Sequence, residues 1–377
     1  MSRIFRIVAL NFQARISKVF DGQPDSQTPL PACGECLLEI RGGYRYKGGR
    51  REEERSVGMT DDRPERVTRL KKWLIAGRPW ALPASTMPVL FGTSLAVVIR
   101  GAGLDVPGFL AALLAMMTLH TAANMLSDVF DFKRGLDRDV TPVSGAIVRG
   151  WLSPKQVAAG SILLFVFGAG LGIALVIRTG AVLLWIGAAG IAVGASYSFL
   201  KSRALGDLAV FLNFGILGSL GAWVIQTKTF SWLPVVWTVP MAMLVIGILH
   251  ANNWRDIVTD SGKKVFTMAC LLRDRGSLVY YGVLLFGSMT LIILYVCVPQ
   301  VAAFGLPALP PTFLIVFVAL PRALALWKRA LKRHSPAAPM DFIILDGATA
   351  GYNLLFGLLC TAALWLDFAL KKMGVYR

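Results

Sequence analysis

Long apolar runs separated by short polar segments fill the chain from Leu82 to Leu370. The runs are close to 20 residues long, the length that an α-helix needs to cross the hydrocarbon core of a bilayer. They predict an all-α polytopic membrane protein with about nine transmembrane helices, at 82–100, 106–126, 156–177, 181–200, 205–226, 233–251, 278–298, 307–326 and 342–369.

The composition agrees with a membrane protein and excludes an ordinary soluble domain. Hydrophobic residues make up 55% of the 377 positions and charged residues 16%, whereas soluble domains carry about 25% charged residues. The net charge is +17 at pH 7, which in a soluble protein would suggest nucleic-acid binding. The distribution of that charge along the predicted spans gives a different explanation, in which no nucleic acid takes part.

Positive charge gathers in alternate loops. If the N-terminus lies in the cytoplasm, the inward loops hold seventeen Lys and Arg residues and the outward loops hold only Arg100, Arg178 and Lys228. The short C-terminal tail, with three more basic residues, is the exception. This asymmetry follows the positive-inside rule, and it predicts which loops face the cytoplasm.

Residues 1–72 differ from the rest and are predicted to be a basic cytoplasmic extension of a transmembrane domain at 73–377. They are rich in Arg, Gly and Glu, and they lack the apolar core and cleavage site of a signal peptide. A disordered tail, sequence upstream of a start at Met59, and an amphipathic helix lying on the membrane surface remain alternatives. Cys33 and Cys36 supply only two of the four ligands of a structural zinc ion.

The first of two acidic clusters lies at the inward end of the second predicted span. Asn124, Asp128 and Asp131 step by four and three residues, so they share one face of a helix, and Asp137 follows them. Taken alone, this pattern is equally compatible with a helix end that runs into a charged, solvated loop.

The second cluster lies at the inward end of the sixth predicted span, where Asn252, Asp256 and Asp260 step by four along one predicted helix face. Carboxylates at a membrane boundary are costly and are usually functional. Mg²⁺ prefers oxygen ligands and commonly bridges carboxylates to substrate phosphates. Two such clusters on one side of the membrane, with Lys and Arg beside them, predict Mg²⁺ ions that hold a diphosphate.

Five segments carry a resemblance to a known family: Arg78–Pro83, Ser127–Asp137, Tyr197–Asp207, Asn252–Asp260 with Thr267, and Asn353–Gly357. They resemble the motifs of the UbiA superfamily of intramembrane prenyltransferases. The match is closest to the branch that prenylates 1,4-dihydroxy-2-naphthoate in menaquinone synthesis. The resemblance covers about residues 70–370 and leaves the N-terminal extension outside it.

The resemblance implies a helical bundle around a central cavity, Mg²⁺ as cofactor, a polyprenyl diphosphate donor and an aromatic acceptor. Carried over by position, the metal ligands would be Asp128, Asp131, Asp137, Asp256 and Asp260. Asn252 would contact the metal or a phosphate. The phosphate charge would be neutralised by Lys201, Arg203 and Arg255. For Arg255, an acceptor carboxylate is the alternative partner.

Two positions depart from the family pattern. Ser127 stands where the family often has Asn before the first Asp, and Asn124, one turn earlier on the same face, is expected to take that role. Val265 and Phe266 stand before Thr267 where the naphthoate branch usually has basic residues. The second departure affects the prediction of the acceptor more than the prediction of diphosphate chemistry.

Other polar and aromatic residues have both a functional and a structural interpretation. His120 and His250 could act as a general base, or could pack at a polar helix end. Asp207 could belong to the site, or could cap a helix N-terminus. Tyr197 and Tyr280 could stabilise an allylic cation, although aromatic residues are common at membrane interfaces without that role.

The predicted function is Mg²⁺-dependent transfer of a polyprenyl group to an aromatic acceptor, expected to be 1,4-dihydroxy-2-naphthoate, in a bacterial or archaeal cytoplasmic membrane. Sister transferases with a hydroxybenzoate, chlorin, haem or glycerol phosphate acceptor are one alternative. A cation-coupled transporter is another, and it would place its binding site near the middle of the membrane. A non-catalytic binding partner on the same scaffold is a third.

Overall fold

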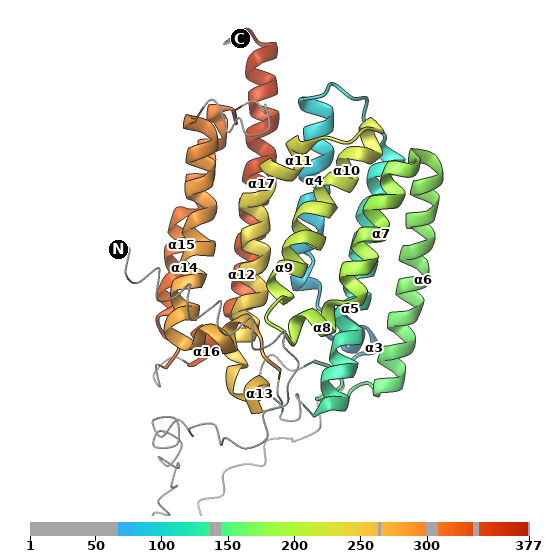
Figure 1. Cartoon of the computed structure of the whole chain (residues 1–377), viewed down its shortest axis with the longest axis vertical. Coiled ribbons are helices and arrows are strands. Elements are labelled where there is room, and N and C mark those ends of the chain that lie inside the picture. Colours follow the sequence, from blue (N-terminus) through green and yellow to red (C-terminus); the bar gives the residue numbers. More distant parts are fainter. Residues whose placement is uncertain are drawn as a thin grey trace, which may run out of the picture. The chain divides into compact units, whose positions relative to one another are not determined.

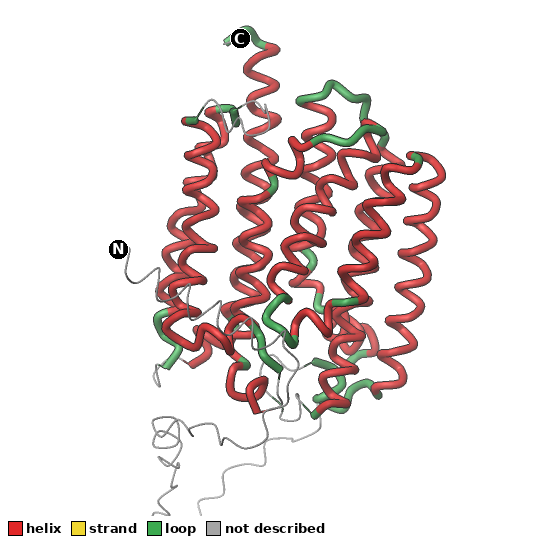
Figure 2. The backbone as a smooth tube through the Cα atoms, in the orientation of Figure 1, coloured by secondary structure: helices red, strands yellow, loops and turns green. Residues whose placement is uncertain are grey.

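The computed structural model describes residues 67–135, 140, 145–262, 265–298, 308–334 and 339–375. The predicted N-terminal extension up to residue 66 and the candidate ligand Asp137 lie outside the described residues. Residues 65–377 form one compact unit. The prediction of an all-α fold is confirmed, since the described residues form helices and no strand, with one isolated bridge between Arg203 and Phe266 (Figure 2).

The described helices run back and forth across one bundle (Figure 1). In chain order they are α3 (Arg69–Gly77), η1 (Pro79–Ala81), α4 (Pro83–Val98), α5 (Val106–Arg134), α6 (Pro154–Thr179), α7 (Ala181–Ala195), α8 (Tyr197–Lys201), α9 (Gly206–Val210), η2 (Phe211–Leu217), α10 (Gly218–Thr227), α11 (Trp232–Trp237), α12 (Val239–Arg255), α13 (Ile257–Gly262), α14 (Met268–Cys297), η4 (Pro311–Ala319), α15 (Leu320–Ala330), α16 (Pro339–Ile343) and α17 (Leu345–Lys372).

Fewer helices than the nine predicted spans are long and apolar enough to cross a membrane. Among the described residues, six helices are long and apolar enough to cross a membrane, or seven if the segment from Arg69 to Val98 counts as one bent span. Each of the nine predicted spans falls on a helix, but α7 has only 15 residues and α12 only 17. Helices of that length cover about 22–26 Å, less than the hydrocarbon core. Nine spans therefore stay a prediction.

A bend between α3 and α4 comes from the Arg78–Pro83 motif. Arg78 takes a left-handed backbone conformation with φ 49°, which ends α3, and Pro79 and Pro83 each begin the next helical segment. Proline suits a first helical position because its missing N–H has no partner there in any case. The two segments meet at 53°, and this bend turns the Arg78 side chain toward α5.

The outer faces of α6 and α7 are apolar and exposed, as expected for helices that contact lipid. Leu163, Ile177, Trp185 and Ile191 are each at least 70% exposed. In water so large an apolar surface would promote aggregation. In a bilayer the same surface is suited to contact with the lipid chains. Larger apolar and aromatic side chains are buried between α4, α10, α12, α14 and α17, where the core of the bundle lies.

One end of the bundle carries the short helices α8, α13 and α16, and α17 ends at the opposite end, beside the C-terminus (Figure 1). The charge-rich loops of the sequence, as far as they are described, join helices at the α8–α13 end, which we call the charged end. The loops at the opposite end of the bundle contain the ion pair between Arg178 and Asp105, 3.2 Å apart.

We expect the charged end to face the cytoplasm, because the basic residues are distributed so unevenly between the two sets of loops. In a cysteine-depleted background, Lys155→Cys and Arg275→Cys should stay unlabelled by a membrane-impermeant maleimide in intact cells. The control Gly103→Cys, on the opposite loop, should be labelled. All three should react once the membrane is permeabilised. Labelling of Lys155→Cys or Arg275→Cys from outside would overturn this orientation.

Candidate active site

A cavity of about 560 Å³ opens at the charged end, and both acidic clusters line its mouth. Three cationic side chains, Arg78, Lys201 and Arg255, lie beside the carboxylates. Further in, the wall becomes largely apolar and comes from α4, α5, α6, α7, η2 and α12. The structure thus brings together two segments that are 128 residues apart in the sequence, each at the end of its own helix.

The first cluster keeps its predicted geometry because α5 is continuous from Val106 to Arg134. Asn124, Asp128 and Asp131 all line the cavity. Asp128 is buried and accepts a hydrogen bond of 2.6 Å from Arg78. Asp131 accepts from Ser127 at 3.4 Å, and the Lys201 ammonium lies 3.9 Å from its carboxylate.

Gly145 packs directly against the first cluster. A Cβ atom added to Gly145 would lie 2.8 Å from an oxygen of the Asp128 carboxylate, closer than real Cβ atoms approach a neighbour. The absence of a side chain therefore lets the chain after α5 return close to Asp128, and Gly145 is itself part of the cavity wall.

The second cluster does not lie on one continuous helix, so that part of the prediction is wrong. Helix α12 ends at Arg255, Asp256 occupies the break, and α13 starts at Ile257. All three predicted side chains still line the cavity, because the break turns the chain without carrying it away from the mouth. Asp260 is 5% exposed.

Arg255 is held entirely by protein groups. Its Nε donates to Asp256 at 3.1 Å, and one terminal nitrogen donates to Asp346 and to the Ile343 carbonyl, each at 3.1 Å. The other terminal nitrogen donates to Asn252 and again to Asp256. A guanidinium has five N–H donors, so none is left for a phosphate or for an acceptor carboxylate. In this structure the Arg255 side chain holds Asn252, Asp256 and Asp346.

The charges of these neighbours also set the pKa of Arg255 and of Lys201. Burial by itself lowers the pKa of Arg255, but Asp256 and Asp346 outweigh it, so the value lies above the ordinary one. Burial likewise lowers the pKa of Lys201, and the fields of Tyr197 and of nearby carboxylates, Asp131 first among them, raise it above its usual range. Lys201 thus remains a cation at the cavity mouth.

Several predicted residues are not brought to the cavity. The exposed Arg203 places its guanidinium 3.6 Å from the centre of the Phe199 ring, outside the cavity wall. Asp207 and His250 are buried 3.7 Å apart behind the wall, and Asp207 makes no helix cap. Tyr280 packs edge-on against His250. By contrast, the other two candidates of this group, His120 and Tyr197, do line the cavity.

Two charged residues of the cavity were not predicted as part of the site. The sequence places Arg78 only within the Arg78–Pro83 motif, and for Asp346, at the start of the last predicted span, it indicates only an interfacial or capping role. Asp346 does accept the backbone N–H of Gly347 at 2.8 Å, but its other oxygen holds Arg255. The Arg255–Asp346 contact joins residues 91 positions apart, and no local sequence pattern signals a contact of that range.

A network behind Arg255 fixes the end of α12. The Asp274 carboxylate accepts from the indole of Trp254 at 2.8 Å, from Arg333 at 3.0 Å and from His334 at 3.0 Å. Arg333 also donates to the carbonyl of Arg255 at 3.4 Å. Trp254 and Arg255 are therefore tied to α14 and to the turn after α15.

The apolar departure at Val265 and Phe266 has a structural explanation. Val265 is buried, and the backbone N–H of Phe266 donates to the carbonyl of Ser202 at 3.3 Å. Thr267 is the N-cap of α14 and accepts the N–H of Cys270. This segment joins the α13–α14 connection to the loop after α8, and neither the buried Val265 nor the exposed Phe266 lines the cavity.

Fold and cavity together define an all-α integral membrane protein with a charged cavity mouth and an apolar interior. The model of the UbiA prenyltransferase family matches residues 85–345. The chain therefore belongs to the UbiA prenyltransferase family, and it is a prenyltransferase.

Relatives of this chain include animal proteins. It is 30% identical over 322 residues to the UbiA prenyltransferase domain-containing protein 1 homolog of Drosophila melanogaster, covering 82% of this chain and 83% of that protein. It is 30% identical over 264 residues to the UbiA prenyltransferase domain-containing protein 1 of Homo sapiens, covering 66% and 76%. These relatives give no support to the expectation of a bacterial or archaeal membrane.

Solved structures show the same fold. A UbiA homologue from Aeropyrum pernix K1 in its apo form superposes with a TM-score of 0.54 at 16% identity, over 75% of this chain and 97% of that one. A UbiA homologue from Archaeoglobus fulgidus bound to GPP and Mg²⁺ superposes with a TM-score of 0.52 at 14% identity, over 77% and 99%.

Proposed function

We propose that this prenyltransferase moves a polyprenyl group from a polyprenyl diphosphate to an aromatic acceptor, with the diphosphate bound at the charged cavity mouth. The observation that carries this proposal is the meeting of two carboxylate clusters and two cations, Arg78 and Lys201, around one opening. The largely apolar wall behind them suits a hydrocarbon chain and an aromatic ring.

The carboxylates at the mouth fit Mg²⁺ as the cofactor. Within the described ranges, no three His, Cys, Asp or Glu side chains converge closely enough to hold a metal ion by themselves. Mg²⁺ is usually held by one or two carboxylates together with substrate phosphates. The pairs of carboxylates in the two clusters can therefore hold it together with a diphosphate. Bound Mg²⁺ would stabilise the charge of the departing diphosphate. The proposed ligands are Asp128, Asp131, Asp256 and Asp260, with Asn124 and Asn252 beside them and Asp137 by resemblance.

The chain's own side chains then have separate tasks. Lys201 and Arg78 are placed to bind phosphate oxygens, and Arg255 holds Asn252 and Asp256 in position. In the transfer the C1–O bond of the donor breaks and its electron pair leaves with the diphosphate. A ring carbon of the acceptor forms the new C–C bond and loses its proton; with 1,4-dihydroxy-2-naphthoate the carbon that bears the carboxylate is substituted, and the carboxylate leaves as CO₂. The apolar interior keeps water from the allylic cation.

The position of the charges favours a transferase over a cation-coupled transporter. The carboxylates lie at one end of the bundle, with basic groups beside them, whereas transport sites lie near the middle of the membrane. From the distribution of basic residues, we place the diphosphate site on the cytoplasmic face.

The acceptor that we propose first is 1,4-dihydroxy-2-naphthoate, from the resemblance of Asn252–Ile257 to the naphthoate branch. We expect the purified protein in lipid nanodiscs to prenylate it faster than 4-hydroxybenzoate, with release of CO₂. EDTA should stop the reaction and added Mg²⁺ should restore it. Mass spectrometry of the lipid product, with labelled donors of several chain lengths, measures each of these.

The outcomes separate the parts of this proposal. Faster turnover of hydroxybenzoate would make the naphthoate assignment wrong while leaving prenyl transfer in place. Prenyl transfer that continues at full rate in EDTA would refute the metal requirement. No product from any donor with either acceptor would count against the aromatic acceptor itself.

A further inference from the structure

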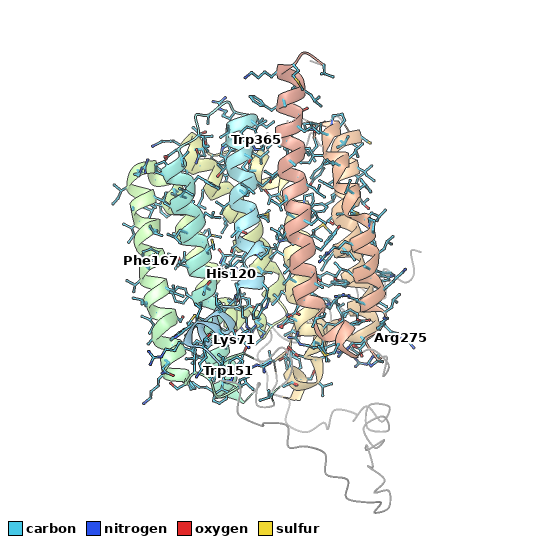
Figure 3. The ribbon with its side chains drawn as sticks, turned by 180° about the vertical axis from the view of Figure 1, so that it is seen from behind. Lys71, His120, Trp151, Phe167, Arg275 and Trp365 are labelled. Atoms are coloured by element: carbon cyan, nitrogen blue, oxygen red, sulfur yellow. The ribbon has the colours of Figure 1, made fainter. Side chains whose placement is uncertain are left out.

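His120 is a polar residue well inside the cavity. It lies eight residues before Asp128 on the continuous helix α5, which places it about 12 Å further into the bundle. Figure 3 shows it near the middle of the bundle, between Trp151 at the charged end and Trp365 toward the other end. Its side chain lines the cavity, so the site has polar chemistry at two depths.

The hydrogen bonds around His120 define its tautomer. The Ser85 hydroxyl donates to the carbonyl of Leu82 at 3.1 Å, so its single proton is used. The tautomer that fits this arrangement donates from Nδ1 of His120 to the Ser85 oxygen, 3.0 Å away. In the neutral ring Nε2 is left as an acceptor. Phe214 packs against the ring, with centroids 4.5 Å apart and the two ring planes tilted by 36°.

Asn213 is a second polar residue in the inner wall. It belongs to η2, a π-helical segment, and such segments often occur at functional sites. Its amide lies against α7, where Cβ atoms added to Gly190 and Gly194 would approach it to 3.0 and 3.6 Å. Within the described part of the chain the Asn213 amide has no hydrogen-bond partner, and it lines the cavity.

The surroundings of His120 and Asn213 are apolar. Side chains of Ala84, Phe165, Val193, Val210 and Leu249 form the inner wall with them. A buried polar group in such a wall is costly if nothing pairs with it, and a prenyl chain offers no partner. The charged groups of the cavity, Arg78, Lys201 and Arg255 among them, lie at its mouth. The inner wall therefore suits an uncharged oxygen substituent on an aromatic ring.

We propose that His120 and Asn213 form the subsite that binds the ring oxygens of the acceptor. A hydroxyl of the ring donates to Nε2 of His120, and the Asn213 amide binds a second hydroxyl or carbonyl oxygen. These contacts orient the ring so that one carbon faces the donor at the cavity mouth. This inference rests on the proposed prenyl transfer to an aromatic acceptor, and it adds the residues that select for hydroxylated rings.

Two substitutions at His120 isolate the Nε2 contact. Asn places its amide nitrogen where Nδ1 stood, so His120→Asn keeps the bond to Ser85 and removes the acceptor at Nε2. Gln reaches the Nε2 position, so His120→Gln restores an acceptor there. We expect His120→Asn and Asn213→Leu to raise the acceptor KM by about 10- to 100-fold, and His120→Gln to stay within about threefold of the unmodified protein.

The probe acceptor is whichever of 1,4-dihydroxy-2-naphthoate and 4-hydroxybenzoate the protein prenylates. The KM of the prenyl diphosphate, and its binding in the absence of acceptor, should not change in these variants. The matched control is Ser288→Ala, a buried hydroxyl in α14 that bonds only its own helix backbone. It should leave both KM values unchanged.

An unchanged acceptor KM in both His120→Asn and Asn213→Leu would overturn the inference, with prenyl transfer itself intact. So would a change confined to the prenyl diphosphate KM, because the inner cavity would then hold the prenyl chain. If the unmodified protein neither binds a prenyl diphosphate nor forms product, the proposed function fails instead. If Asn213→Leu does not fold, the His120→Asn and His120→Gln pair decides alone.

Discussion

Asp128→Asn and Asp256→Asn should each lower prenyl transfer by at least about 10³-fold, while the protein still folds and inserts. Asn has nearly the shape of Asp and its oxygen can still accept a hydrogen bond, so the contact with Arg78 persists in Asp128→Asn, and one of the two hydrogen bonds from Arg255 persists in Asp256→Asn. The negative charge that would hold Mg²⁺ is lost. The rate of product formation at saturating Mg²⁺ and donor measures the effect.

The matched control is Asp105→Asn at the opposite end of the bundle. Asp105 is also an ion-paired carboxylate, 3.2 Å from Arg178, and it accepts the backbone N–H of Gly108. This variant should retain near-normal turnover, which excludes a general effect of removing a paired carboxylate. Thermal unfolding in detergent checks the fold of all three. If Asp128→Asn and Asp256→Asn both turn over normally, the assignment of the metal ligands is wrong.

Arg255→Lys should lower kcat by about 10- to 100-fold although the charge is kept. The guanidinium uses all five donors to hold Asn252, Asp256, Asp346 and the Ile343 carbonyl. An ammonium has three donors in a different geometry, so it cannot hold all four groups at once. Because Asn252 and Asp256 belong to the proposed diphosphate site, the KM of the prenyl diphosphate should rise as well.

The acceptor KM distinguishes positioning from direct contact. Since Arg255 has no donor left for a ligand, Arg255→Lys should leave the acceptor KM within about threefold of normal. A selective rise in the acceptor KM would instead show that Arg255 binds an acceptor carboxylate during turnover. Arg178→Lys, at the opposite end of the bundle, is the control for exchanging an ion-paired Arg, and it should change neither kcat nor KM.

The charged mouth and the inner wall divide the cavity into two functional parts. Substitutions at the mouth should act on the diphosphate, and those at His120 and Asn213 on the acceptor. Measuring both KM values for every variant therefore tests the division directly, because each class of substitution has a different expected pattern.

The sequence by itself determined the features that depend on local periodicity and composition. Apolar runs near 20 residues gave the all-α membrane fold, because each helix must satisfy its own backbone in lipid. The four-and-three spacing of Asn124, Asp128 and Asp131 placed them on one face, and it held because α5 is unbroken there. The motif segments carried the family, and the family model matches residues 85–345.

Local pattern was less reliable where a helix breaks or a span is short. The spacing of Asn252, Asp256 and Asp260 assumes a continuous helix, and α12 ends before Asp256. Nothing in the spacing signals that end, because Arg255 is drawn to Asp346 and Ile343 from the other side of the site. Similarly, hydropathy located the fourth span but not its length, since α7 has only 15 residues.

Only the tertiary structure decided which charges work together. Arg78 reaches Asp128 across 50 residues and Arg255 reaches Asp346 across 91, while Arg203, though close to Lys201 in sequence, turns outward onto Phe199. His120 and Asn213 share one wall for the same reason. Such pairings depend on how separate helices pack, and a periodic pattern within one helix carries no information about the neighbour that it will face.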